Sequence, residues 1–265
     1  MKFLQLNNCG GAIAIALATI LFTPKLTAAP AIDPDADRIL QSACKYLADA
    51  KNFCVKVEVW KDAVLPNGQK LQTTRTLDVQ QTRPNRLHIE VRSPRDSRGF
   101  WLRDKSLTML DRSLNFYGVM EVPEKIDDAF DAVEDRFGVE IPLADVLVSD
   151  PYANLMGSVD STTDLGKVAV LGVVCNHLAF TGTNADFQVW LADGPKPLPR
   201  KVVITFKNKP GSPQITQIFS DWDLVSPIAD SVFTFTAPDE AKKIVVNPKQ
   251  PEPEDAAEEP APAAK

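Results

Sequence analysis

The feature that most constrains the fold is an alternation of apolar and polar side chains with a period of two, repeated along most of the chain. Residues 187–206 read FQVWLADGPKPLPRKVVITF, with Val189 and Leu191 before a turn and Val202 and Ile204 after it. Alternate residues of a strand point to the same face, so each arm has one apolar face. In the turn, Gly tolerates positive φ, and Pro removes ladder donors. The stretch predicts a β-hairpin with one buried face.

Strand candidates of this kind number about ten and fall into three groups. Six precede Pro123, among them a hairpin with an Asn67-Gly68 turn, three or four follow residue 160, and a late one lies near Phe233. Few helices separate them, which predicts an antiparallel meander of about ten or eleven strands. A sheet of this size twists and curls, so its apolar concave face has to be covered.

Two segments change the hydrophobic period to about 3.6 and predict amphipathic helices that can supply this cover. The first runs from Pro34 to Lys51, with Asp33 as the N-cap and Pro34 at the first helical position. The second places Phe130 and Phe137 on one face and ends at Gly138, which is suited to a helix C-terminus. The fold class expected is therefore α+β.

Both ends of the chain differ in composition from the middle. Residues 1–31 carry Lys2 followed by the apolar run Ala12–Phe22, which is too short for a membrane span and is typical of a secretory signal peptide. Residues 247–265 are rich in Pro, Ala and Glu, which predicts a disordered tail. The globular domain is then residues 32–246, exported to the periplasm.

Charge and motifs argue against several function classes. The net charge is −6, so nucleic acid is not expected as a partner. His88 and His177 show no ligand spacing, and no catalytic or cofactor motif is found, so we expect no metal, no cofactor and no enzymatic activity. Cys44, Cys54 and Cys175 would remain after export. One disulfide or three buried thiols are both compatible with that number.

Several local motifs carry a resemblance to a known family. They are RPNRL, IPLADVLVSDPYANLM, VVCNHLAF, FQVWLADGPKPLPRKVVIT and VFTFTAPDEAKKI, in that order. From about Asp33 to Ile244 the chain resembles an uncharacterised family of predicted bacterial periplasmic proteins, catalogued as a domain of unknown function. The resemblance implies the fold of the lipoprotein-carrier superfamily, an unclosed β-barrel lidded by an N-terminal helix and a mid-chain helical insert. It also implies that Arg83 of the RPNRL turn helps to hold the lid closed.

Members of that superfamily bind acyl chains, so the resemblance implies a non-enzymatic binding protein for a lipophilic small molecule or lipoprotein acyl chains. The alternative is an envelope protein whose concave face is filled by its own helices and which binds another protein. If a ligand site exists, the alternation and the helix stripe place these residues on it: Val57, Val59, Leu77, Leu87, Ile89, Phe130, Phe137, Val189, Leu191, Val202 and Ile204.

Overall fold

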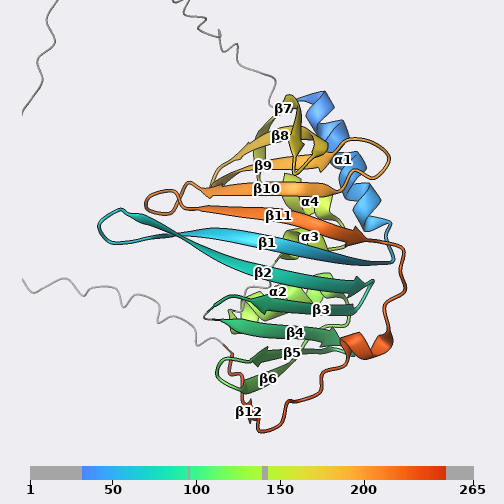
Figure 1. The fold of residues 1–265 in the computed structure, drawn as a ribbon, viewed down its shortest axis with the longest axis vertical. Helices are drawn as coiled ribbons and strands as arrows, with labels where there is room; N and C mark the ends of the chain where they lie inside the picture. Colours follow the sequence, from blue (N-terminus) through green and yellow to red (C-terminus); the bar gives the residue numbers. More distant parts are fainter. Residues whose placement is uncertain (1–31, 95, 139–142, 249–265) are drawn as a thin grey trace, which may run out of the picture.

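The alternating segments pair into a 12-stranded sheet, with helices along one of its faces (Figure 1). The computed structural model describes residues 32–94, 96–138 and 143–248, so the expected signal peptide and all but the first two residues of the expected tail lie outside the described residues. The strands are β1 (Asn52–Val64), β2 (Lys70–Thr82), β3 (Arg86–Arg92), β4 (Ser97–Arg103), β5 (Ser106–Asp111), β6 (Phe116–Glu121), β7 (Val159–Val170), β8 (Val173–Gly182), β9 (Ala185–Ala192), β10 (Pro199–Phe206), β11 (Gln214–Asp223) and β12 (Lys242–Ile244).

The sheet is unclosed, with the order β12-β6-β5-β4-β3-β2-β1-β11-β10-β9-β8-β7. Strands β1 to β6, and strands β7 to β11, pair antiparallel with their neighbours along the chain. β1 joins the two groups by pairing with β2 on one side and β11 on the other, so that Val57 lies opposite both Leu77 and Phe219. The expected antiparallel, curved and unclosed sheet is confirmed. The described residues contain 12 strands because the three-residue β12 adds to β6 in parallel.

A late strand does exist, but not at Phe233 as expected. Phe233 ends a short 3₁₀ helix, η1 (Asp230–Phe233), and is 1% exposed. The next aromatic residue, Phe235, packs its ring 5.0 Å from that of Trp101. Trp101 lies on the convex face, since its neighbours Phe100 and Leu102 face the core on the other side. The alternation in VFTFT therefore comes from a segment that packs on the sheet without pairing in it.

Four α-helices are described: α1 (Pro34–Ala48), α2 (Ile126–Phe137), α3 (Ala144–Leu147) and α4 (Pro151–Met156). The Asp33 carboxylate caps α1 by accepting from the backbone N–H groups of Asp35 and Ala36. Gly138 ends α2 with a φ of 66°, a left-handed conformation that glycine adopts without strain. The caps expected from the sequence are confirmed. None of the described helices is long and apolar enough to cross a membrane.

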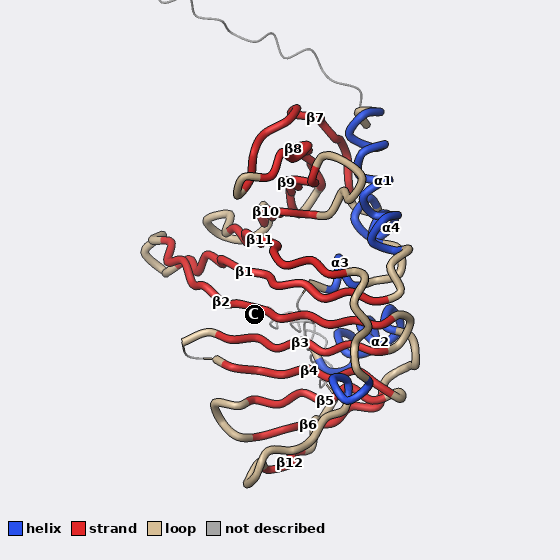
Figure 2. Tube along the Cα trace, turned by 45° about the vertical axis from the view of Figure 1, so that its right-hand side comes forward, coloured by secondary structure: helices blue, strands red, loops and turns tan. Residues whose placement is uncertain are grey.

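Topology explains why the helices lie on the concave face (Figure 2). Apart from β12, the strands β6 and β7 form opposite edges of the sheet and are consecutive in the chain. Their connection has to cross the whole sheet, and it contains α2, α3 and α4. On the way it covers apolar side chains that would otherwise face water.

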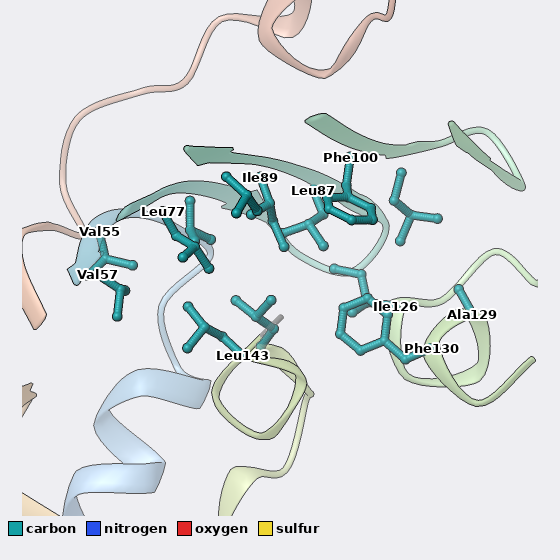
Figure 3. Close-up of a cluster of buried hydrophobic side chains, with 14 of the residues drawn as sticks. Val55, Val57, Leu77, Leu87, Ile89, Phe100, Ile126, Ala129, Phe130 and Leu143 are labelled. Carbon is teal, nitrogen blue, oxygen red and sulfur yellow. The ribbon is translucent and has the colours of Figure 1, made fainter. Parts of the chain in front are cut away.

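The main core lies between α2 and strands β1 to β5. Figure 3 shows Leu87 and Ile89 of β3 and Phe100 of β4 facing Ile126 and Phe130 of α2. Ile89 is 0% exposed and Phe130 6%. A second cluster of buried residues joins α1 to β8 and β9. Between these two clusters the packing is incomplete.

Candidate ligand-binding site

An open cavity of about 180 Å³ lies between α1, α3 and α4 on one side and strands β9 to β11 on the other. Its wall is mostly apolar, and the polar side chains Asp145, Asn154, Ser158 and Gln217 complete it. The apolar part, with the Cys44 thiol, consists of Leu40, Ala43, Cys44, Leu47, Val146, Pro151, Leu155, Phe187, Val189, Leu191, Pro199, Val202 and Ile204. We call this space the large cavity.

Strand register builds the floor of the large cavity. Val202 lies opposite Val189, and Ile204 lies opposite Phe187, so four apolar side chains from two strands form a flat patch on the concave face. Val202 and Ile204 are only half-buried, in contrast to the fully buried side chains of the main core. Incomplete burial of apolar side chains in a concave wall is a feature of ligand pockets.

The roof comes from α1 and α4. Leu40, Ala43 and Leu47 recur at spacings of three and four, which places them on one face of α1 above the floor. Pro151 and Leu155 of α4 complete the roof, and the Asp150 carboxylate caps α4 by accepting from the Ala153 N–H. Ala43 is the smallest roof side chain, and space remains beneath it.

A second cavity of about 110 Å³ adjoins the first, and Gln217 of β11 lines both. We call it the small cavity. Its wall contains Val59, Lys61, Arg75, Leu77, Leu143, Ile215 and Gln217. The two cavities therefore follow the concave face across β1, β2 and β9 to β11.

The structure divides the site residues expected from the sequence into three sets. Val189, Leu191, Val202 and Ile204 line the large cavity. Val59 and Leu77 line the small cavity. The others lie in or against the main core and on neither cavity, and they are Val57, Leu87, Ile89, Phe130 and Phe137.

Sequence reasoning missed several lining residues. Leu40, Ala43 and Leu47 belong to a helix stripe visible in the sequence, and Phe187 belongs to the same alternation as Val189, so both patterns contained the signal. No local signal selects Gln217, since a polar residue within an alternating strand is normally assigned to the solvent face.

Arg83 contacts the helical insert directly. Its Nη1 donates to the carbonyl oxygens of Leu147 at 3.1 Å and Val148 at 2.9 Å, and Gln81 Nε2 donates to the same Leu147 oxygen at 2.8 Å. These carbonyls lie at the C-terminus of α3, where helix carbonyls lack intrahelical partners. Burial lowers the pKa of Arg83 from its usual value, and nearby Asp127 opposes the change. A latch role for Arg83 stays a prediction.

Cys44 contributes a thiol to the wall of the large cavity. Burial, and then the charge of Asp150, raises the pKa of the Cys44 thiol to about 12, so it carries no thiolate at neutral pH. Cys44, Cys54 and Cys175 are all free thiols. Within the described ranges, no group of three or more His, Cys, Asp or Glu side chains is placed to hold a metal ion.

Both histidines have ordinary structural partners on the convex face. The His88 ring stacks on Trp101 at 4.8 Å, and the His177 ring stacks on Trp190 at 4.1 Å. Cys175, two residues before His177, is 0% exposed and donates weakly to its own strand at the Val173 carbonyl. This is the geometry of packed strand residues.

The fold and the cavities together define an α+β protein in which an open antiparallel sheet holds apolar space beneath its helices. The chain belongs to the family described as "Predicted periplasmic protein (DUF2092)", whose model matches residues 36–247. The family membership expected from the sequence is thereby confirmed. No curated protein matches the chain.

Solved structures with a similar fold include three from bacteria. The Mycobacterium tuberculosis lipoprotein LppX is 12% identical with a TM-score of 0.46, and the match covers 74% of this chain and 98% of that one. A LolA superfamily protein from Nitrosomonas europaea is 13% identical with a TM-score of 0.39, covering 76% and 97%. MucB in its complex with MucA from Pseudomonas aeruginosa is 17% identical with a TM-score of 0.38, covering 77% and 62%.

Proposed function

We propose that this protein is exported to the periplasm, loses its signal peptide, and there holds a lipophilic ligand, such as an acyl chain, without catalysing a reaction on it. The observation that carries the proposal is the large cavity, an apolar and partly open space in whose wall Val202, Ile204 and Leu155 are only half-buried. In the free protein this apolar surface is in contact with water. A lipophilic ligand that covers it removes apolar surface from water, and this supplies the affinity for such compounds.

The volume limits what can bind without a rearrangement. A cavity of about 150 Å³ accommodates benzene, so the large cavity of about 180 Å³ takes one short alkyl segment. Each buried methylene contributes about 0.8 kcal/mol, and several are needed to offset the cost of association. A longer chain would have to continue into the small cavity or displace the α4 roof, so a single-chain ligand is favoured over a compound with several chains.

Lipid analysis of the native protein tests this proposal. The protein is purified from the periplasm of its own bacterium, without detergent, and extracted lipids are identified by mass spectrometry. Purified protein is then titrated with a fluorescent fatty acid. We expect co-purified lipid and saturable uptake, and a lipid-free protein that takes up no probe would contradict the proposal.

A matched pair of variants locates the site. Ile204→Asp places a carboxylate in the floor of the large cavity, at a position that is half-buried, so the fold should tolerate it while probe uptake falls. Thr205→Asp introduces the same charge at the next position of β10, on the opposite face. Equal loss of uptake in both variants would mean that the probe binds elsewhere.

Envelope protein binding is the second candidate, and one observation favours it. The β7–β8 hairpin at the free edge of the sheet exposes Leu165, Val168, Leu171 and Val174, at 53%, 46%, 67% and 51%. Grouped apolar side chains on an edge are typical of an interaction surface. Failure of the lipid experiment, together with crosslinking of a periplasmic protein through this hairpin, would favour this function.

A further inference from the structure

The small cavity differs from the large one in having two cations on its wall, Lys61 of β1 and Arg75 of β2. Lys61 continues the concave row of Val57 and Val59 at the next alternate position, and Arg75 lies opposite Val59. Both side chains therefore project from the concave face of the sheet. Arg75 is half-buried and Lys61 is exposed, so the cations stand where the cavity meets solvent.

Neither cation has an electrostatic partner in the described part of the chain, in contrast to the other two basic residues of β1 and β2. Other basic residues on β1 and β2 are paired: Lys56 lies 3.2 Å from Asp221, and Lys70 lies 3.9 Å from Asp62. Among the described residues, no hydrogen bond or ion pair involves the Lys61 or Arg75 side chain, and no described residue lining the small cavity is acidic. In a chain of net charge −6, two adjacent unpaired cations form a local positive site.

Strand register connects this positive site to the large cavity. Lys61 lies opposite Ile215, which lies opposite Ile204 on the floor of the large cavity. Neighbouring strands are about 4.8 Å apart, so the backbones of Lys61 and Ile204 are separated by about 10 Å. The polar and apolar parts are thus adjacent on one continuous face.

Gln217 stands between the two parts. It pairs with Val59 on one side and Val202 on the other, and its side chain lines both cavities. Its amide has no hydrogen-bond partner among the described residues. The acidic residue of the large cavity, Asp145, is on α3 and accepts from Asn154. Negative charge on a ligand is therefore favoured at the small cavity and disfavoured at the α3 side.

We propose that the ligand is a single-chain amphiphile with an anionic head group, a carboxylate or a phosphate. The head group binds Lys61 and Arg75, and the alkyl chain passes Gln217 into the large cavity. Arg forms paired hydrogen bonds with either anion, and Lys adds a point charge. This inference rests on the proposed function, since it assigns the head-group end of the same ligand.

A series of C12 compounds tests the head group. Dodecanoate, dodecyl phosphate, dodecanol and dodecyltrimethylammonium are titrated, below their micelle concentrations, against protein loaded with a neutral fluorescent probe. We expect the two anions to displace the probe at least about tenfold more tightly than the alcohol. The preference between carboxylate and phosphate then shows which class of lipid supplies the head group.

Paired variants assign the preference to the two cations. Lys61→Gln with Arg75→Gln should bring the anions to within about twofold of the alcohol. The control, Lys56→Gln with Arg92→Gln, removes one Lys and one Arg from the convex face and should leave the preference intact. This control double variant loses the same two positive charges as the Lys61/Arg75 double variant.

The outcomes separate the two proposals. If the alcohol binds as tightly as the anions, or if both double variants lose the preference equally, the head-group assignment is overturned while the proposed function stands. If no C12 compound and no probe bind, both are overturned. If the anions bind more tightly than the alcohol, and only the Lys61/Arg75 double variant loses this preference, the assignment of the head-group site is supported.

Discussion

Filling the large cavity should stabilise the protein, and Ala43→Leu is the substitution that tests this. Ala43 lies on the roof face of α1, is 3% exposed, and lines the cavity. Leucine is also a good helix former, so the change costs α1 only a few tenths of a kcal/mol. The added isobutyl carbons point into space that the wild-type protein leaves unfilled.

The expected gain follows from the volume. Leucine adds three carbon atoms to alanine, and burial of about 0.8 kcal/mol for each sets an upper bound of about 2.4 kcal/mol. A cavity of about 180 Å³ accepts this group without displacing its wall. After the propensity cost and the loss of side-chain rotamer freedom, a net stabilisation of about 1 kcal/mol is expected.

Ala36→Leu on the same helix is the matched control. Ala36 is 0% exposed, packs in the cluster that includes Leu178 and Phe180, and lines neither the large nor the small cavity. The same isobutyl group is then forced into filled space, which costs about 1 to 3 kcal/mol.

Urea unfolding followed by tryptophan fluorescence measures both variants. The midpoint should rise for Ala43→Leu and fall for Ala36→Leu, with the slope unchanged. Uptake of the fluorescent fatty acid should fall in Ala43→Leu although the protein is more stable. Equal destabilisation of both variants would refute the reasoning, because it would show that the space under Ala43 does not accept an alkyl group.

Three further predictions concern other parts of the molecule. Arg83→Leu removes two charged hydrogen bonds to the end of α3, so amide hydrogen exchange in α3 and α4 should quicken while the β1–β2 hairpin is unaffected; unchanged exchange would remove the latch role. Backbone N–H donors, first that of Asp164, lower the pKa of Asp33, so its charge stabilises the fold above its unfolded pKa and this contribution is lost as the pH falls. Asp33→Asn, which keeps a cap, should therefore lower the free energy of unfolding at pH 7 more than at pH 2 to 3, and a parallel offset at both pH values would contradict this. Cys44 should resist iodoacetamide at pH 8 in the native state and react only after denaturation, as measured by peptide mass spectrometry; rapid native labelling would contradict its burial.

The sequence predicted the helix ends correctly where a single capping residue determines them. Asp33 and Gly138 are at the ends of α1 and α2 because capping chemistry acts within a few residues of the chain. The alternation around Ile89 also identified the buried face of its strand, since a period of two assigns every second side chain to one side.

Which helix roofs the cavity was not predictable in the same way. The stripes of α1 and α2 are similarly apolar, yet Leu40 and Leu47 border the large cavity while Phe130 packs into the main core. The choice depends on which strands each helix packs against, α1 on β8 and β9 and α2 on β1 to β5, and these are contacts between segments far apart in the sequence. Lys61 and Arg75 were missed because an alternation pattern selects apolar positions only, and cations at the end of an apolar row are assigned to solvent.

The position of β1 has a consequence for how this chain can fold. β1 is the first strand made, and β2 to β6 can pair with it and with one another as they appear, by short hairpins. Its other edge pairs with β11, where Lys56 lies opposite Ser220. That ladder closes a loop of more than one hundred residues, a non-local contact of the kind that slows folding. Before β11 has been synthesised, the edge of β1 that will pair with it is unpaired and has apolar residues beside it. Such an open edge is an aggregation hazard during synthesis. The chain therefore needs protection longest at a ladder that lies in the middle of the finished sheet.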